Sequence, residues 1–512
     1  MGFDGAMAGP CDRCADGDTS PTTITCLRPQ IGCVQGIRRS HVLIREPVEE
    51  EALMAFADLR EFLTKLDEAG LLQRAAREVN PRYEIGAIGR KLDDIQGPAV
   101  IFPNVKGFAH PVVMNIFGTR MDRIALAMEC SAEALIDTWL QRGAAFVQPT
   151  LAQSAPCHQN VMLGSQVRLH EVIPQIVWNS LDGGPYITFG LMFSRDPVTS
   201  VGNMSIYRLM ITGERRLTVN LGPPRDAATA FLKAERMERP LDVAVVIGAD
   251  PVLYLASQAP LPYGSYELEL AGALRQAPVA VVKCKTVDLE VPATSEIVLE
   301  GKLLPHVRET EGPFGDFTGH IGPADLRPVI EITAVTYRDD PLYLCTYAGS
   351  PPTEEHVMHS LTNSAERYRQ VRESTAPTVK DVFFPLAGCS EFHVRVAFRK
   401  ESPGQAKNVI LDLLKNPAIK SCVIVDEDID IRDSTQVEWA IATRVRPDRD
   451  ILIVSDIAGH PLDPSQPGPA PASKYGIDAT VPFGVEFPQR VEVDDQATQL
   501  VDSSWTYYFQ TI

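Results

Sequence analysis

The feature that most constrains the fold is a long series of strand-like segments across residues 158–345. Apolar pieces follow one another with Gly, Pro and Asp between them, and several alternate apolar with polar residues. Alternation with a period of two is typical of a strand that buries one face. The clearest pieces are YITFGLMFSRD, NMSIYRLMITG, RRLTVNLG, LDVAVVIGAD, SEIVLEGKLL and PVIEITAVTYRDD. With few helical insertions, such as YELELAGAL, residues 151–350 are predicted to form a β-rich barrel or sandwich.

The residues before this centre mix helices and strands. FADLREFLTKLDEAGLLQRAA (56–76) repeats apolar residues at helical spacing, and SAEALIDTWLQRG (131–143) predicts a helix with Ser131 as its N-cap. GPAVIFPNV and HPVVMNIFG are short apolar runs beside Pro or Gly and predict strands. Residues 54–150 are therefore predicted to form a mixed α/β lobe.

The residues after the centre change pattern again. Residues 351–376 predict a linker helix that is polar on most faces. Strands alternate with helices from VKDVFFPLAG to DILIVSD, which predicts a second α/β domain over 377–490, followed by a tail over 491–512. A chain of 512 residues exceeds what one hydrophobic core normally serves, so several domains are expected. The fold class predicted is α+β.

The first 53 residues lack any apolar period and are rich in Gly, Pro, Asp and Thr, so a disordered leader is expected. Four cysteines there leave a second interpretation open, because four thiolates can hold a zinc ion. They are Cys11, Cys14, Cys26 and Cys33. Met54 stands at the start of an amphipathic helix and is an alternative start of translation.

Charge and hydropathy exclude several classes of partner. The formal charge of −18 disfavours nucleic-acid backbones and anionic membranes, both of which need a cationic surface. No run of 18 apolar residues predicts a membrane span, and the N-terminus has no secretory signal pattern. The expected compartment is the cytoplasm.

Two carboxylates flank a tight turn in RETEGPFGDFTGH: Glu311 and Asp316, separated by Gly-Pro-Phe-Gly. Paired carboxylates can divide acid and base roles when their environments differ. Arg208 lies in the apolar run VGNMSIYRLM, and a buried arginine needs an anionic partner. The three residues predict either a catalytic carboxylate–guanidinium–carboxylate group or a structural salt bridge.

A second candidate is the pair Glu267 and Glu269 on an otherwise apolar helix, where either could bind Mg²⁺ or Mn²⁺ or simply face solvent. His356 and His359 lie three apart and hint weakly at a metal. The sequence contains no P-loop, no Rossmann G-x-G-x-x-G, no G-x-S-x-G and no H-E-x-x-H.

These pieces occur together, and in this order, in one family. The chain resembles the UbiD-type decarboxylases, which use prenylated FMN, from Ala55 to Asp478. The matching stretches are DLREFLTKLDEAG, GGPYIT, GNMSIYR, VVIGADP, YELELAGAL, VKCKTVDLEVPATSEIVLEG, EGPFGDFTGH, VDEDIDIRD, WAIATRV and KYGIDAT. The resemblance implies that the β-rich centre is a split-barrel-like domain that binds the flavin, and that the C-terminal domain supports a homodimer or a higher homo-oligomer.

The resemblance also implies roles for matching residues. Arg208, Glu311 and Asp316 would be the catalytic group, with Asp316 as the acid/base. The metal, Mn²⁺ or Mg²⁺, would be held by Asn203 and Glu267 and would bridge to the cofactor phosphate, with K⁺ as a second cation expected there. The remaining residues expected to contact the cofactor are Ser205, Ile206, Tyr207, Arg225, Ser257 and Lys474.

One position departs from the family pattern. The family usually supplies a histidine as third metal ligand about eighteen residues after the arginine, and counting from Arg208 leads to Asp226. Asp226 is an acceptable hard ligand that adds negative charge. A shifted alignment or a weakened site would explain the same departure.

The resemblance implies a reversible, non-oxidative decarboxylase of an unsaturated acid, aromatic or heteroaromatic, with a flavin prenyltransferase as the supplier of the cofactor. The modified flavin would act as the electron sink, and a positioned acid would protonate carbon after CO₂ leaves. Two other classes stay open: a flavin or metal-phosphate binding protein without turnover, and a carboxylate-pair hydrolase without cofactor.

Overall fold

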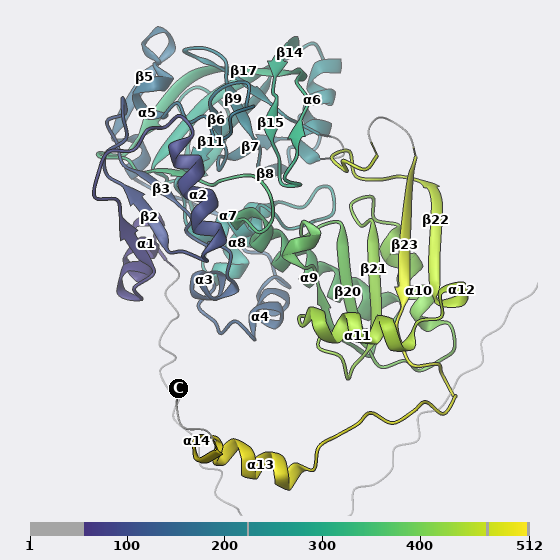
Figure 1. Cartoon of the computed structure of the whole chain (residues 1–512). Coiled ribbons are helices and arrows are strands. Elements are labelled where there is room, and N and C mark those ends of the chain that lie inside the picture. Colours follow the sequence, from purple (N-terminus) through teal and green to yellow (C-terminus); the bar gives the residue numbers. More distant parts are fainter. Residues whose placement is uncertain (1–55, 223–224, 467–470, 509–512) are drawn as a thin grey trace, which may run out of the picture. The chain divides into compact units, whose positions relative to one another are not determined.

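The computed structural model describes residues 56–222, 225–466 and 471–508 (Figure 1). The expected leader with its four cysteines, and the alternative start at Met54, lie outside these ranges. Among the described residues, no helix combines the length and the apolar character that a membrane span requires.

The N-terminal part is a small sheet covered by helices, and its strand order is β1-β2-β3-β18. The last strand, β18, arrives from the far end of the central part and pairs in parallel with β3. The bounds are α1 Leu59–Glu68, β1 Leu72–Arg74, α2 Glu84–Asp94, β2 Ala99–Phe102, β3 Val112–Met114, α3 Met121–Ala127, α4 Leu135–Arg142 and β18 Tyr343–Cys345.

Two predictions for this part were wrong in detail. The helix expected over 56–76 ends at Glu68, because Gly70 adopts a φ of +69° and the chain continues as β1. The helix expected from Ser131 begins at Leu135 and has no side-chain cap. By contrast, Asp58 caps α1 by accepting a hydrogen bond from the Glu61 N–H at 3.1 Å.

The central part is a nine-stranded sheet in the order β6-β9-β10-β17-β14-β11-β7-β8, with β5 paired to β17. Every pairing in it is antiparallel, and the long strands β14 and β17 curl the sheet into a half-barrel (Figure 1). The α+β fold class and the split-barrel-like centre are thus confirmed. Its strands are β5 Asn160–Leu163, β6 Tyr186–Ile187, β7 Leu191–Arg195, β8 Gly202–Ile206, β9 Leu209–Ile211, β10 Arg216–Val219, β11 Leu241–Ile247, β14 Ile297–Glu311 and β17 Asp325–Tyr337.

Shorter elements complete the centre. A three-stranded sheet and a two-stranded hairpin stand apart from the main sheet. They comprise β4 Thr150–Leu151, β12 Ala280–Lys283, β13 Glu290–Pro292, β15 Phe314–Gly315 and β16 Ile321–Gly322. The helices are η1 Pro156–His158, η2 Gly164–Gln166, α5 Leu169–Val172, α6 Asp226–Arg236, α7 Pro251–Ala256 and α8 Glu267–Arg275.

The C-terminal part is a five-stranded sheet in the order β19-β20-β21-β23-β22, with separate apolar clusters on its two faces. Strand β21 shows why. Cys422 and Ile424 pack toward α10, whereas Val423 and Val425 pack toward α11, so all four central residues of the strand are apolar. The bounds are α9 Glu354–Ser374, β19 Val379–Phe383, η3 Leu386–Gly388, β20 His393–Phe398, α10 Gln405–Leu414, β21 Ser421–Asp426, α11 Ser434–Arg444, α12 Pro447–Asp450, β22 Ile451–Ile457, β23 Ala472–Asp478, α13 Asp495–Ser503 and α14 Trp505–Tyr508.

Helix α9 was predicted to be a linker helix that is polar on most faces, and the structure buries much of its first half. Its N-terminal turns are buried although they are polar. The buried polar residues there are Glu354, His356, His359, Ser360, Thr362 and Ser364.

Candidate active site

The three residues expected to be catalytic meet in the structure. The Arg208 Nε and Nη2 atoms donate to the two carboxylate oxygens of Glu311 at 3.0 and 3.1 Å, which is a bidentate pair. The Arg208 Nη1 atom donates to Oδ2 of Asp316. One guanidinium therefore binds two carboxylates that lie about a hundred residues further along the chain than Arg208.

Local backbone breaks place these side chains. The sequence predicted NMSIYRLMITG as one strand, but the ladder stops at Ile206 and resumes at Leu209. Tyr207 and Arg208 occupy the break. The Arg208 side chain therefore does not have to follow the alternation of side chains along a strand. Glu311 is the last residue of β14 and pairs with Asp325 of β17.

The turn between Glu311 and Asp316 is held from the Asn179–Gly183 loop. The N–H of Gly183 donates to the Pro313 carbonyl at 2.7 Å, and the N–H of Gly315 donates to the Asp182 carboxylate at 2.9 Å. A Cβ at Gly183 would lie 2.1 Å from the Gly312 oxygen, so only glycine permits this approach. The GGPYIT stretch thus fixes the EGPFGD turn.

Burial differs between the two carboxylates. The Glu311 side chain is fully buried and also accepts a hydrogen bond from the Tyr186 hydroxyl at 3.1 Å, whereas the Asp316 side chain is 15% exposed. Burial raises the pKa of Tyr186, and the Glu311 charge adds to that effect. Burial alone would lower the pKa of Arg208, but Asp316 and Glu311 outweigh it and raise that pKa.

Asp316 is anchored through its own loop. Its Oδ1 accepts the Phe317 N–H at 2.9 Å. His356 fixes the same loop, since its Nε2 lies 2.8 Å from the Phe317 carbonyl and its Nδ1 accepts the Thr353 N–H at 3.1 Å. These partners require a neutral ring that donates through Nε2, and burial accordingly lowers the pKa of His356 to about 4.

Glu355 is a residue that sequence reasoning missed. It precedes His356 at the start of α9 and is half-buried. Burial raises the pKa of its carboxyl to about 7. The negative charge of Asp316 contributes to that shift, which places the two carboxyls within electrostatic reach of one another. A helix that is polar on most faces gives no local signal that would single out Glu355.

A second group forms where β8 meets α8. Glu267, the first residue of α8, accepts from the Met204 N–H at 2.9 Å and faces the Asn203 amide at 3.3 and 3.4 Å. The alternative that Glu267 faces solvent was wrong, because it is buried. Burial raises the pKa of Glu267 to about 7, and the charge of Asp226 adds to the shift. Asp226, the first residue of α6, is half-buried.

The donor set of this group fits a hard divalent cation. The Asn203 Oδ1 atom is buried and has no hydrogen-bond partner among the residues that the structure describes. With the Glu267 and Asp226 carboxylates it offers three oxygen ligands of the kind that Mn²⁺ and Mg²⁺ bind. Within the described ranges there is no cluster of three or more His, Cys, Asp or Glu suited to a metal, so the amide is needed to complete this set.

The other residues expected at the cofactor divide into two sets. Ser205 and Ile206 end β8, and the Arg225 guanidinium donates to the Ile206 carbonyl at 3.3 Å and lies 5.5 Å from the Tyr207 ring centre. Lys474 does not join this group in the structure. Its ammonium donates to the carbonyls of Leu414 and Asn416 at the end of α10, and burial lowers its pKa to about 8.

Ser257 is the C-cap of α7, and its hydroxyl donates to the Tyr254 carbonyl at 2.7 Å. It also accepts a hydrogen bond from the Gln258 amide at 3.2 Å. The hydroxyl is therefore already engaged within the central part of the chain.

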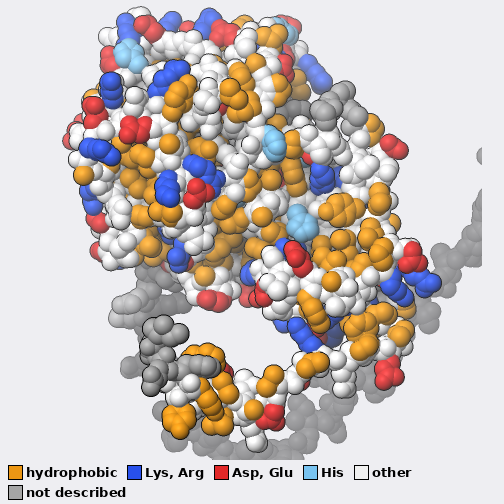
Figure 2. Space-filling model, viewed as in Figure 1, with side chains coloured by type: hydrophobic (Ala, Val, Ile, Leu, Met, Phe, Trp, Pro, Cys, Tyr) orange, Lys and Arg blue, Asp and Glu red, His pale blue; other side chains and the backbone are white. Residues whose placement is uncertain are grey.

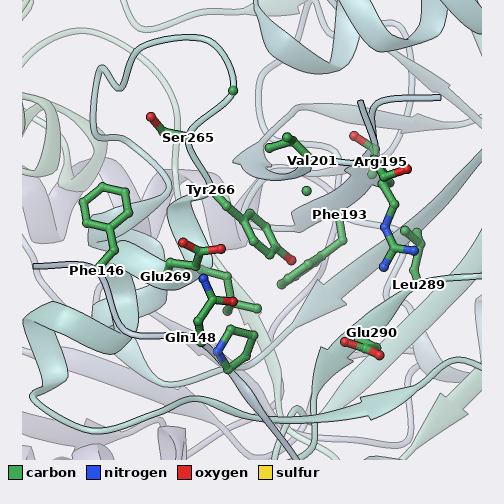
Figure 3. Close-up of a pocket in the computed structure, with 16 residues that line it drawn as sticks. Phe146, Gln148, Phe193, Arg195, Val201, Ser265, Tyr266, Glu269, Leu289 and Glu290 are labelled. Carbon is green, nitrogen blue, oxygen red and sulfur yellow. The ribbon is translucent and has the colours of Figure 1, made fainter. Parts of the chain in front are cut away.

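A cavity of about 480 Å³ lies next to the Asn203–Glu267 group and not at Arg208 (Figure 3). It is lined by Gly202 and Tyr266, the neighbours of Asn203 and Glu267, and by Phe146, Phe193 and Arg195. Glu269, the second carboxylate of α8, lines this cavity. It therefore does not belong to the group formed by Glu267.

Comparisons with known proteins assign the family. The model of the 3-octaprenyl-4-hydroxybenzoate carboxy-lyase N-terminal domain matches residues 63–143. The Rift-related domain of the same carboxy-lyase matches 150–351, and its C-terminal domain matches 356–479. The chain belongs to the UbiD family. It is accordingly a carboxy-lyase, as the sequence resemblance implied.

Individual UbiD relatives support this assignment over most of the chain. The anhydromevalonate phosphate decarboxylase of Methanothermobacter thermautotrophicus is 37% identical over 427 residues, which are 83% of this chain and 97% of the relative. The UbiD-class enzyme HmfF from Pelotomaculum thermopropionicum, solved with FMN, is 39% identical with a TM-score of 0.81 and covers 87% of this chain and 99% of its own.

A third relative is the vanillic acid decarboxylase of Sedimentibacter hydroxybenzoicus, solved in an open and a closed form. The closed form has a TM-score of 0.80 at 32% identity and covers 89% of this chain and 99% of its own. The open form has a TM-score of 0.78. The flavin expected from the sequence is consistent with the flavin complexes of this enzyme class.

Proposed function

We propose that this UbiD-family chain decarboxylates an unsaturated, aromatic or heteroaromatic acid with prenylated FMN and a divalent metal. The observation that carries the proposal is the shared guanidinium of Arg208, which joins a fully buried carboxylate to a partly exposed one. A purely structural salt bridge has no need of the second, exposed carboxylate, whereas a proton-transfer site does.

The residues would divide the work as follows. When bound, the modified flavin supplies an electron sink for the carbon that loses CO₂. Glu311 holds the plane of the Arg208 guanidinium, and Arg208 holds Asp316 in place. Asp316, which is partly exposed, delivers a proton to the product carbon, and Glu355, whose carboxyl is electrostatically coupled to Asp316, would replenish that proton. Asn203, Glu267 and Asp226 would hold Mn²⁺ or Mg²⁺.

The charges around Asp316 bear on the substrate. The carboxyl of Glu355 and the Asp316 carboxylate disfavour a second anionic group beside them, whereas hydroxyl and N–H substituents would find acceptors there. Two relatives are named for vanillic and 3,4-dihydroxybenzoic acid, both aromatic acids with hydroxyl groups. A third is named for anhydromevalonate phosphate, so a phosphorylated acid is the second candidate.

The test is CO₂ release by protein produced together with a flavin prenyltransferase. The panel should contain hydroxylated benzoates, nitrogen heterocyclic acids and a phosphorylated unsaturated aliphatic acid, with carboxylation at high bicarbonate as the reverse assay. Turnover confined to the phosphorylated acid would reject the aromatic assignment. Activity in colourless, flavin-free protein would instead support a carboxylate-pair hydrolase.

We also infer assembly into a homodimer or a larger homo-oligomer through the tail. Figure 2 shows hydrophobic side chains along α13 and α14, and none of the residues of these two helices is buried. Exposed apolar residues include Val491, Val493, Leu500 and Tyr507. Such a surface is typical of an interface. A chain that ends at Arg490 should sediment as a smaller species than the full chain, and unchanged sedimentation would reject the tail as the contact.

A further inference from the structure

A group of polar side chains, with His359 buried and its partners half-buried, lies outside the site described above and joins the central and C-terminal parts of the chain. The His359 Nδ1 atom lies 2.7 Å from Glu391 Oε1, and the His460 Nε2 atom lies 3.3 Å from Glu391 Oε2. On the other side, His359 Nε2 lies 2.6 Å from Gln258 Oε1. We call His359, Glu391, His460 and Gln258 the histidine latch.

The members of the latch come from the central and the C-terminal parts of the chain. Gln258 follows α7 in the central part, His359 lies on α9, Glu391 precedes β20, and His460 follows β22. Any movement of the C-terminal sheet away from the centre must therefore break the contacts of Glu391 with His359, or those of His359 with Gln258.

Both hydrogen-bond partners of His359 are acceptors. Glu391 offers a carboxylate, and Gln258 offers its amide oxygen. The amide cannot simply be reversed, because Gln258 Nε2 donates to the Ser257 hydroxyl at 3.2 Å and that hydroxyl donates to the Tyr254 carbonyl. A ring that donates at both nitrogens is an imidazolium, so His359 is positively charged in this arrangement.

The electrostatics of the latch agree with this geometry. Burial alone would lower the pKa of His359, but the hydrogen bond and charge of Glu391 outweigh it and raise that pKa. Burial alone would raise the pKa of Glu391, but the hydrogen bonds from His359 and His460 outweigh it and lower that pKa. His359 and Glu391 thus form an ion pair that is little screened by solvent.

Other charged groups face the latch from each neighbouring element. On α9, Glu355 supports the His359 charge, and the neutral His356 lies one turn away. At the start of α6, Arg225 opposes that charge. Beyond His460, Asp463 is already paired with Lys420 at 3.0 Å, and Cys389 lies within reach of the Glu391 charge.

The latch also touches the loop that carries Asp316. The ring of His460 packs edge-on against Phe317 at 5.5 Å between centres, and it packs at a tilt against Phe392 at 5.3 Å. Phe317 directly follows Asp316 and donates its N–H to that carboxylate. The C-terminal part therefore contacts the Asp316 loop through Phe317, which packs against both His460 and Phe392.

We propose that the histidine latch fastens the C-terminal part of the chain to the Ser257–Gln258 segment, and that His359 is its protonation-dependent positioning residue. The latch holds when His359 is protonated and Glu391 is ionised. Loss of the His359 proton leaves Gln258 Oε1 or Glu391 without a donor and releases the C-terminal part.

The direction of the pH dependence follows from the raised pKa of His359. A group whose folded pKa is raised contributes its full stabilisation below its ordinary value, about 6.5 for histidine, and loses it as the pH rises through the folded value. The lowered pKa of Glu391 keeps the carboxylate ionised across mildly acidic pH. The latch is therefore closed at pH values below the ordinary histidine pKa and opens as the pH rises through the raised pKa of His359.

Hydrogen–deuterium exchange on the full chain tests the proposal without any need for turnover. The probes are the backbone amides of residues 257–261, 386–392 and 458–463, with rates corrected for the intrinsic effect of pH. In the wild-type protein their protection should fall roughly tenfold as the pH passes the raised pKa of His359. Protection of β14 should not change over the same range.

Substitutions separate the latch from general packing. His359→Gln and Glu391→Gln should remove the pH step and leave these segments at the low level of protection at every pH, with protection of β14 retained. The matched control is His306→Gln, since His306 pairs with Glu238 at 3.0 Å on the exposed surface and should leave the pH step intact.

Two outcomes of these experiments would contradict the proposal. A flat pH profile in the wild-type protein, or a wild-type profile in either latch variant, overturns the latch. If His359→Gln does not fold, the wild-type profile and Glu391→Gln still decide. The readout does not depend on the proposed decarboxylation, so the failure of one does not imply the failure of the other.

Discussion

Replacing Asp316 by asparagine tests the proposed chemistry most directly. The substitution keeps the shape of the side chain but removes the proton that a carboxylic acid can deliver. The Asp316 oxygens accept from Arg208 and from the Phe317 N–H, and an amide can satisfy only one of these donors through its oxygen. The lost charge-assisted hydrogen bond should lower the free energy of unfolding by about 1–3 kcal/mol, which a UbiD-family fold of this size tolerates.

The expected effect on the rate is much larger. A positioned acid is worth roughly 10²–10⁴-fold, or about 3–5 kcal/mol of activation free energy. The assay is CO₂ release by cofactor-loaded Asp316→Asn at a temperature well below its melting point, together with exchange of the product C–H in D₂O. Both rates should fall together, while the flavin content stays at the wild-type level.

The matched control is Asp325→Asn. Asp325 pairs with Glu311 across the β14–β17 ladder but points its carboxylate to solvent, where it meets Arg327 at 3.2 Å. This variant should retain the wild-type rate. If Asp316→Asn, folded and loaded, also turned over at nearly the wild-type rate, Asp316 would be a structural partner of Arg208 and the proton would come from elsewhere, with Glu355 as the next residue to test.

Three further predictions concern separate parts of the chain. Arg208→Lys should slow CO₂ release by roughly 10–100-fold with flavin retained, because an ammonium cannot copy the fork that binds both oxygens of Glu311; a rate within twofold of wild type would contradict this. Glu267→Gln should lose bound metal and flavin as measured by elemental analysis and absorbance. The pKa of Glu267 is raised to about 7, so in metal-free protein its ionisation destabilises the fold as the pH rises. Glutamine does not ionise, so the melting temperature of Glu267→Gln relative to wild type should be higher at pH 8 than at pH 5. A chain that begins at Met54 should keep its activity and metal content, and a loss of either would support a role for the leader cysteines.

Much of the fold could be predicted from the sequence because its strands are amphipathic or apolar over their full length. The alternating pieces between residues 158 and 345 became the strands of the central sheet, and the apolar β21 became a strand buried on both faces. The break at Tyr207 and Arg208 could not be predicted, since SIYRLM continues an apolar pattern without Gly or Pro. The break is imposed by the partners of Arg208, which lie about a hundred residues further along the chain.

The start of α9 shows the same limit more sharply. Its residues Glu355, His356 and His359 are polar, so helical periodicity assigns them to a solvated face. His356 and His359 instead contact partners that are remote in sequence: the Phe317 carbonyl for His356, and Glu391 and Gln258 for His359. Burial of such residues becomes favourable only when these partners supply every hydrogen bond, and those bonds exist only after three parts of the chain have come together. The polar first half of α9 therefore contains a carboxyl coupled to Asp316 and a charged histidine. The local sequence pattern gives no signal for either of them.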